Sequence, residues 1–274
     1  MEDDDYRYLD YYGKMRARFV AGQHLIQLAI FDSDLIQLRA LIDEDGININ
    51  EDKSGGGCPL MTAVVCDNLE ATRILLEAGA DPFHPHVDGL GCYTPLSVAA
   101  SRGRLEISHL MWNRIPLSRL SEHENGPHSH DSCLVNAATY GRTAVLEYLL
   151  DGWFDRAVWG TSALDNALMS AVMFGWHVHA VTLLLERVKT YTTEKLQDAL
   201  FAAVDFKHMG PTDIENPGYQ GADFFNQETL VKRLIEAGSF DPNVCKRGRP
   251  LLHWSADAAN LIGALRAVLT KGET

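Results

Sequence analysis

The sequence is poor in the features that mark disulfide-stabilised, secreted or membrane-spanning proteins. Its five cysteines are an odd number and form no CxxC pair, which argues against a disulfide framework in a chain with this much apolar material. No run of about 18 uncharged apolar residues is present, so no segment is expected to span a bilayer. The start, MEDDDYRYLDYY, has neither a basic leader nor an apolar run, so no secretory signal is expected. The cytoplasm or the nucleus is therefore the predicted compartment.

Basic residues are also scarce. The chain has 24 Lys and Arg against 37 Asp and Glu, and its formal net charge is −13. A surface of this sign repels phosphate backbones and anionic lipid head groups, so neither nucleic acid nor a membrane is an expected partner. The cations that would have to form a basic patch are too scattered to do so: Arg16, Arg18, Arg102, Arg104, Lys246, Arg247 and Arg249. A partner with basic or apolar contact residues is expected instead.

Signatures of catalytic and nucleotide sites are missing as well. The chain has no G-x-S-x-G elbow and no H-E-x-x-H helix. Lys53 precedes Gly55, Gly56 and Gly57, whereas a phosphate-binding loop needs its lysine after the glycines. This stretch is better explained as a flexible turn. No cofactor is predicted.

The chain does contain a repeated pattern. One alanine recurs at steps of 34, 36, 38, 34 and 32 residues: Ala29, Ala63, Ala99, Ala137, Ala171 and Ala203. In the first five copies an apolar pair begins 12 residues after that alanine: Leu41-Ile42, Leu75-Leu76, Met111-Trp112, Leu149-Leu150 and Leu183-Leu184. Chance apolar runs do not keep one offset five times. The pattern predicts an array of similar units.

Each unit has the pattern expected of two short antiparallel helices. The alanine suits a first helix that packs closely on its neighbour, and the apolar pair lets a second helix cover the first. Four residues after the alanine stands a glycine or a small polar residue that lets the chain reverse: Ser33, Asp67, Gly103, Gly141 and Gly175. Gly79 and Pro82 end a second helix and begin a finger-like turn. The predicted fold is therefore all-α.

The units resemble the ankyrin repeat, whose signature is Thr-Pro-Leu-His-x-Ala. Residues 94–99, Thr-Pro-Leu-Ser-Val-Ala, match this signature at every fixed position except the histidine. The resemblance divides residues 21–274 into seven units that start near residues 21, 54, 87, 127, 161, 193 and 244, after an N-terminal extension or capping helix at 1–20. It implies a helix-turn-helix solenoid whose concave face and finger turns bind other proteins.

Two insertions interrupt the pattern. Residues 113–131 make an enlarged finger that is polar and rich in histidine, and residues 207–221 make a loop rich in glycine and proline inside the sixth unit. Long insertions in a solenoid project from one face and often carry function. If both insertions close over the concave face, they enclose a pocket.

Histidines are concentrated in two neighbouring fingers. His84 and His86 lie in the finger that enters the third unit, and His128 and His130 lie in the next one. Imidazoles at this density can bind zinc or transfer protons. The simpler explanation, which we adopt, is that they are solvated loop histidines that contribute to a binding surface without holding a metal.

A column of residues lies three positions after each motif alanine, where the first helix ends: Asp32, Cys66, Arg102, Tyr140, Phe174 and Phe206. Three successive units carry an aromatic ring there, and Trp254 extends the series. Either these rings pack beneath the insertions, or they form a hydrophobic binding groove. The predicted binding residues on the concave face and fingers are Arg102, Asn136, Tyr140, Ser170, Phe174, Phe206, Trp254, His84, His86, His128 and His130.

Two functions fit this sequence. The first is a recognition module that binds another protein or a small apolar ligand, with Asn136 and Ser170 giving polar contacts and Arg102 holding an acidic group. The alternative is a non-redox enzyme of cyclase, isomerase or dehydratase type, in which a histidine or tyrosine acts as general acid or base in a closed pocket. The sequence favours the module and leaves the enzyme open. It also leaves open that the chain is the repeat part of a larger protein.

Overall fold

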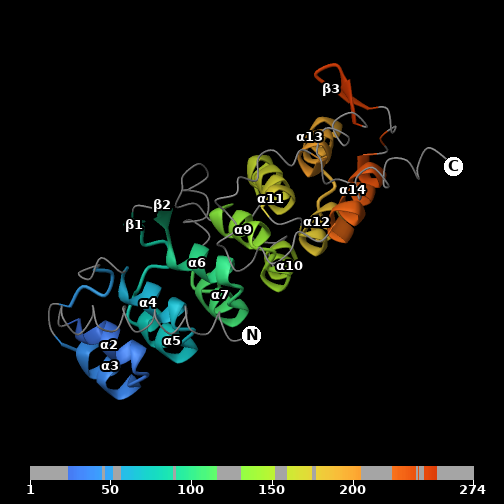
Figure 1. Cartoon of the computed structure of the whole chain (residues 1–274). Helices are drawn as coiled ribbons and strands as arrows, with labels where there is room; N and C mark the ends of the chain where they lie inside the picture. Colours follow the sequence, from blue (N-terminus) through green and yellow to red (C-terminus); the bar gives the residue numbers. More distant parts are fainter. Residues whose placement is uncertain are drawn as a thin grey trace. The chain divides into compact units, whose positions relative to one another are not determined.

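A computed structural model of the chain shows two compact units, residues 1–133 and 134–274. The structure describes residues 24–44, 47–51, 57–88, 91–115, 131–151, 159–174, 177–204, 224–238, 240 and 244–251. The N-terminal segment 1–20, nearly all of both insertions and the helices expected in the seventh unit lie outside these residues. Each unit is described by itself below (Figure 1).

The described elements are helix pairs, as the sequence predicts. The first unit contains α2 (Leu25–Phe31), α3 (Leu35–Ile42), α4 (Pro59–Val65), α5 (Leu69–Glu77), β1 (His86–Asp88), β2 (Gly91–Tyr93), α6 (Pro95–Arg102) and α7 (Leu105–Trp112). The second contains α9 (Asp131–Thr139), which crosses the boundary, α10 (Thr143–Asp151), α11 (Thr161–Met173), α12 (Val178–Arg187), α13 (Thr193–Val204), α14 (Phe224–Gly238), β3 (Cys245–Lys246) and β4 (Arg249–Pro250). Within each unit, first helices pack on first helices and second helices on second helices, as in α4 against α6 and α5 against α7.

The motif alanines are buried within the first helices. All six are almost completely inaccessible: Ala29 and Ala203 are 1% exposed, and Ala63, Ala99, Ala137 and Ala171 are 0% exposed. A larger side chain would push neighbouring helices apart because protein cores are close-packed. This packing confirms why one small residue recurs along the chain.

The chain reverses between the helices of a pair through a left-handed residue. Ser33, Asp67, Gly103 and Gly141 have φ values of 58°, 55°, 72° and 61°. The next residue donates its backbone N–H to the carbonyl of the motif alanine over 2.7–2.9 Å in all four turns. This hydrogen bond closes the first helix and starts the second. The turn predicted from sequence is confirmed at these four positions.

The fifth turn is one residue longer than the others. The N–H bonded to the carbonyl of Ala171 belongs to His177, six residues on rather than five. The residues that directly precede the second helices are Asp34, Asn68, Arg104, Arg142 and His177. In every unit the residue seven positions further on is buried: Leu41, Leu75, Met111, Leu149 and Leu184. The constant offset of 12 is thus wrong for the fifth unit, where Leu184 rather than Leu183 is the equivalent residue.

The connections between helix pairs differ between the two units. In the first unit β1 and β2 form an antiparallel hairpin before α6, with His86 opposite Tyr93 and Val87 opposite Cys92. In the second unit only residues 188–192 join α12 to α13, and the first helices are longer, with 13 residues in α11 and 12 in α13 against 7 in α4. Extra helical turns therefore replace a finger at this connection.

Tyr191 anchors this short connection to α11. Its hydroxyl donates a hydrogen bond to the carbonyl of Leu164 on α11 over 3.1 Å. Burial, helped by the negative charge of Asp165, raises the pKa of the Tyr191 phenol far above its ordinary value. The phenol therefore stays protonated and acts as a structural donor.

All five cysteines carry free thiols. Among the helices of the described residues, none combines the length and the apolar character needed to cross a bilayer.

Candidate binding face

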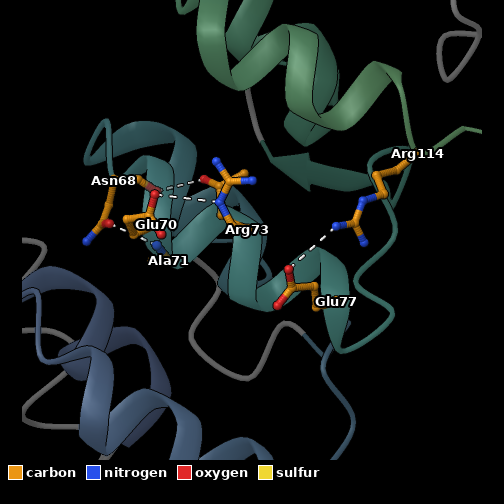
Figure 2. Close-up of polar contacts among 7 residues, drawn as sticks. Asn68, Glu70, Ala71, Arg73, Glu77 and Arg114 are labelled. Atoms are coloured by element: carbon orange, nitrogen blue, oxygen red, sulfur yellow. Dashed lines mark hydrogen bonds and ion pairs between the residues drawn. The ribbon is translucent and has the colours of Figure 1, made fainter.

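Polar side chains at the start of the second helices contact the turn of the preceding helix pair. The amide of Asn68 donates to the carbonyl of Ile30 over 3.2 Å and to the hydroxyl of Ser33 over 3.3 Å. Its side-chain oxygen also accepts the N–H of Ala71 and so caps α5 (Figure 2). Arg104 repeats this contact one helix pair later with an ion pair of 2.6 Å to Asp67. The turns that carry the column residues are thereby held in place.

His177 makes the corresponding contact in the second unit. Its ring donates a hydrogen bond to the carbonyl of Thr139, with 2.9 Å between nitrogen and oxygen. The ring also lies against Gly141, where a Cβ atom would come within 2.5 Å of its Nδ1. Burial lowers the pKa of the His177 imidazole below 6.5, the bond to Thr139 raises it, and the charge of Arg142 lowers it. These contacts indicate a structural role for His177.

Lowering the pH is expected to destabilise the protein through His177. Because its pKa is lower in the folded than in the unfolded state, the unfolded chain takes up a proton first as the pH falls through 6.5. The stability present above pH 6.5 is then lost below it. Urea unfolding at pH 5.5–8 should show a smaller acid-induced loss in the His177→Gln variant. His179→Gln, a change at an exposed ring on the same helix, should behave like the unaltered protein, and identical pH profiles for all three would contradict the assignment.

Ion pairs join successive second helices. Arg114 lies 3.6 Å from Glu77 (Figure 2), and Arg187 pairs with Asp151 and lies 3.9 Å from Glu147. Within α5, Arg73 lies 3.6 Å from Glu70 (Figure 2). These groups are substantially exposed, so each pair contributes at most about 1 kcal/mol to stability. The second helices thus present a charged, internally paired surface, which is typical of a face exposed to water.

The column at the ends of the first helices differs in the two units. In the first unit it contains the exposed Asp32 and the half-buried Cys66 and Arg102. Burial raises the pKa of the Cys66 thiol to about 11, while the charge of Arg102 acts in the opposite direction. The charge of Arg102 thus acts on the thiol of the column residue in the preceding helix pair. At neutral pH Cys66 is therefore a protonated, unreactive thiol.

In the second unit the column is aromatic and exposed. Tyr140 is 44% exposed at the end of α9, and Phe174 is 49% exposed at the end of α11. Nearly all residues of the two insertions lie outside the described part of the chain, so the packing of these rings beneath the insertions stays a prediction beside that of a binding groove. Phe206 and Trp254 lie outside the described residues.

Asn136 and Ser170 lie on the same helix faces as the two rings. Each is half-exposed, and each accepts, through its backbone carbonyl, the N–H of the aromatic residue four positions later, over 3.1 Å for Tyr140 and 3.0 Å for Phe174. Side chains four positions apart on a helix share a face. We call Asn136, Tyr140, Ser170 and Phe174 the aromatic strip. It combines exposed apolar area with nearby amide and hydroxyl groups.

The finger histidines are only partly described. His84 and His86 are half-buried at the β1–β2 hairpin, whereas His128 and His130 lie outside the described residues. Among the residues that can be placed, no group of three or more His, Cys, Asp or Glu side chains has an arrangement suited to a metal. Val87 on β1 of this hairpin is 72% exposed. It was not predicted, because the sequence does not show that Val87 lies on a projecting hairpin.

Charge is divided unequally between the two units. Residues 1–133 contain 21 Asp and Glu against 11 Lys and Arg, whereas residues 134–274 contain 16 against 13. Three of the basic residues, Lys246, Arg247 and Arg249, lie on the β3–β4 hairpin of the second unit, where Lys246 is opposite Arg249.

Comparisons of sequence find no relative. No protein-family model matches the chain, and no curated protein matches it in sequence. Solved structures do match. The human ASB11 ankyrin repeat domain aligns with a TM-score of 0.57 at 19% identity, covering 90% of this chain and 96% of that one. The ankyrin repeat domain of Bcl-3, a member of the IkappaB protein family, aligns with a TM-score of 0.56 at 18% identity, covering 88% and 97%.

These structural matches establish the fold. The chain is an all-α, ankyrin-type helix-turn-helix protein, as its repeat predicts. The insertions that would close a catalytic pocket lie outside the described residues, so the enzyme alternative stays a prediction.

Proposed function

We propose that this chain binds another protein, and that the aromatic strip is a principal contact. The observation that carries the proposal is the exposure of Tyr140 and Phe174 at equivalent positions of successive helix pairs. Large rings exposed in pairs are typical of interaction surfaces, because binding a partner removes their apolar area from water at a small cost in side-chain entropy.

The surroundings of the rings support a protein partner. Asn136 and Ser170 lie beside the rings, and their side chains can form hydrogen bonds with the backbone of a bound chain. A purely apolar surface would leave those backbone groups without hydrogen-bond partners. The contacts of His177 with Thr139 and Gly141 fix the turn that follows Tyr140. A surface held in this way loses little conformational entropy on binding. Aromatic anchors beside polar groups on a rigid scaffold are the usual composition of a binding hot spot.

Replacing both rings by serine should weaken partner binding strongly without unfolding the protein. We expect Tyr140→Ser with Phe174→Ser to weaken binding at least tenfold, because truncating one interface anchor costs about 2 kcal/mol or more. The melting temperature should change little because both side chains are exposed. The matched control is Ile36→Ser on α3, where the side chain is 85% exposed.

The measurement is capture from cell extract followed by quantitative mass spectrometry, combined with photo-crosslinking from benzoylphenylalanine at position 140, 174 or 36. One protein should crosslink from both 140 and 174 but not from 36, and its capture should fail with the double variant alone. Equal capture by all variants would refute the proposal. Loss of a retained apolar small molecule without loss of any protein would reassign the strip to that ligand.

A further inference from the structure

The ends of α9 and α11 present an uncharged surface. In the last two turns of each helix and the residue that follows it, the described side chains that are exposed or half-buried are all uncharged: Val135, Asn136, Thr139 and Tyr140 at α9, and Met169, Ser170, Met173 and Phe174 at α11. This contrasts with the chain as a whole, in which 22% of the residues are charged. The aromatic strip therefore lies in a neutral surrounding.

The charged groups next to this surface interact with other residues. Asp165, earlier on α11, lies 3.5 Å from Lys195. The charge of Arg142, which follows the turn after Tyr140, acts on the ring of His177. An acidic or basic segment bound at the strip would lose hydration without gaining an opposite charge from the side chains described there. An uncharged segment is favoured.

The polar groups of the aromatic strip can donate hydrogen bonds. The Asn136 amide, the Ser170 hydroxyl and the Tyr140 phenol each carry an N–H or O–H group, and within the described part of the chain none of these side chains is engaged in a hydrogen bond. Such a surface suits a segment that presents carbonyl oxygens and few N–H groups. Proline-rich segments do so, because proline has no N–H and the polyproline II helix makes no internal hydrogen bonds.

The repeat also sets the distance between the two rings. Tyr140 and Phe174 are equivalent residues of successive helix pairs, which pack on one another through α10 and α12. Equivalent positions of packed helices lie about 8–10 Å apart. A polyproline II helix rises about 3.1 Å per residue, so each turn of three residues advances it by about 9 Å. Prolines three residues apart therefore match the spacing of the rings.

Neither a β-strand nor an α-helix has this period. A strand returns the same face every two residues, which is about 7 Å. An α-helix returns its face after about 5 Å or, over two turns, about 11 Å. A helix also bonds its own carbonyl groups, so it would offer few backbone acceptors to the Asn136 amide and the Ser170 hydroxyl.

We infer that the aromatic strip binds a proline-rich segment of the protein partner in the polyproline II conformation, with two prolines three residues apart on the rings of Tyr140 and Phe174. Surfaces lined by aromatic rings are typical receptors of such segments, which are largely ordered before they bind. This inference rests on the proposed function and names the chemistry of the partner. It narrows the expectation of a basic or apolar partner, which was drawn from the net charge of −13, to an apolar one at this surface.

Selection from a phage-displayed random dodecapeptide library tests the inference on the full chain. Peptides enriched by the unaltered protein should contain two prolines separated by two residues and should carry few charges. Tyr140→Ser with Phe174→Ser should not enrich them. The matched control is Ile36→Ser, which changes an exposed apolar side chain of the first unit and should select the original peptides.

Fluorescence anisotropy with an enriched peptide tests the spacing. Inserting one alanine between the two prolines should weaken binding at least tenfold, because the second proline then turns away from its ring. Adding the same alanine at the end of the peptide should leave the affinity unchanged. Raising the NaCl concentration from about 50 to about 500 mM should change the dissociation constant by less than about twofold, because salt screens only charged contacts.

The remaining outcomes separate the two proposals. Enriched peptides that lack the spaced prolines, and that the double variant fails to bind, overturn the inference and leave the strip as a binding site. Peptides bound equally by the unaltered protein and the double variant overturn both proposals. No enrichment, equal affinity for the peptide with the inserted alanine, or a loss of affinity of tenfold or more in salt overturns the inference, and capture from cell extract then decides on the strip alone.

Discussion

Replacing Trp112 by alanine is expected to lower the free energy of unfolding by about 3–5 kcal/mol, because it leaves a large cavity in a packed interior. The side chain is 0% exposed and lies at the end of α7, directly after the buried Met111. For a protein stabilised by about 5–15 kcal/mol, this is a large part of the total. Denaturant unfolding followed by far-ultraviolet circular dichroism measures the loss.

Two further variants serve as controls for this experiment. Trp112→Phe keeps most of the buried volume and should lose much less stability than Trp112→Ala. His109→Ala changes an exposed side chain of the same helix and should alter stability by about 0.5 kcal/mol or less. A loss below about 1 kcal/mol for Trp112→Ala would mean that this side chain is not part of a packed core.

Replacing Gly141 by alanine should destabilise the protein by about 2–4 kcal/mol, from a left-handed backbone strain of about 1–2 kcal/mol and a steric overlap of similar cost. Gly141 has a φ of 61°, and the added methyl carbon would lie 2.5 Å from Nδ1 of His177. Gly79→Ala is the matched control, since its φ is 89° and no atom lies within 4 Å of the added carbon. It should show the backbone strain alone.

A double variant isolates the contact between the two residues. In a His177→Ala background the obstacle is absent, so Gly141→Ala should cost about as much as Gly79→Ala. The two changes should therefore be strongly non-additive, as expected for residues in contact. Equal losses for Gly141→Ala with and without the histidine ring would contradict the close approach of His177.

The helices and turns were predictable because the repeat fixes several residues of each unit at once. A buried alanine, a left-handed turn residue and an apolar pair select the same helix-turn-helix structure independently. The extra residue in the fifth turn was not predictable, because Leu183 and Leu184 are both apolar. Either one satisfies an offset counted along the sequence, and only the bond from His177 to Ala171 distinguishes them.

For the candidate site, sequence located the aromatic residues but not their surroundings. The repeat placed Tyr140 and Phe174 in one column, whereas their exposure depends on which neighbours cover them. The position of Lys246 opposite Arg249 was not predictable either, because it depends on the two-residue turn at Arg247 and Gly248.

The contacts made by side chains at the start of the second helices all run from a later helix pair to an earlier one. Besides closing their own turns through the backbone, Asn68, Arg104 and His177 each bond through the side chain to the turn of the preceding helix pair. The loss of a helix pair that starts its second helix with one of these residues is therefore expected to deprive the turn before it of a side-chain bond, whereas the loss of the earlier pair leaves the later turn its own backbone bond.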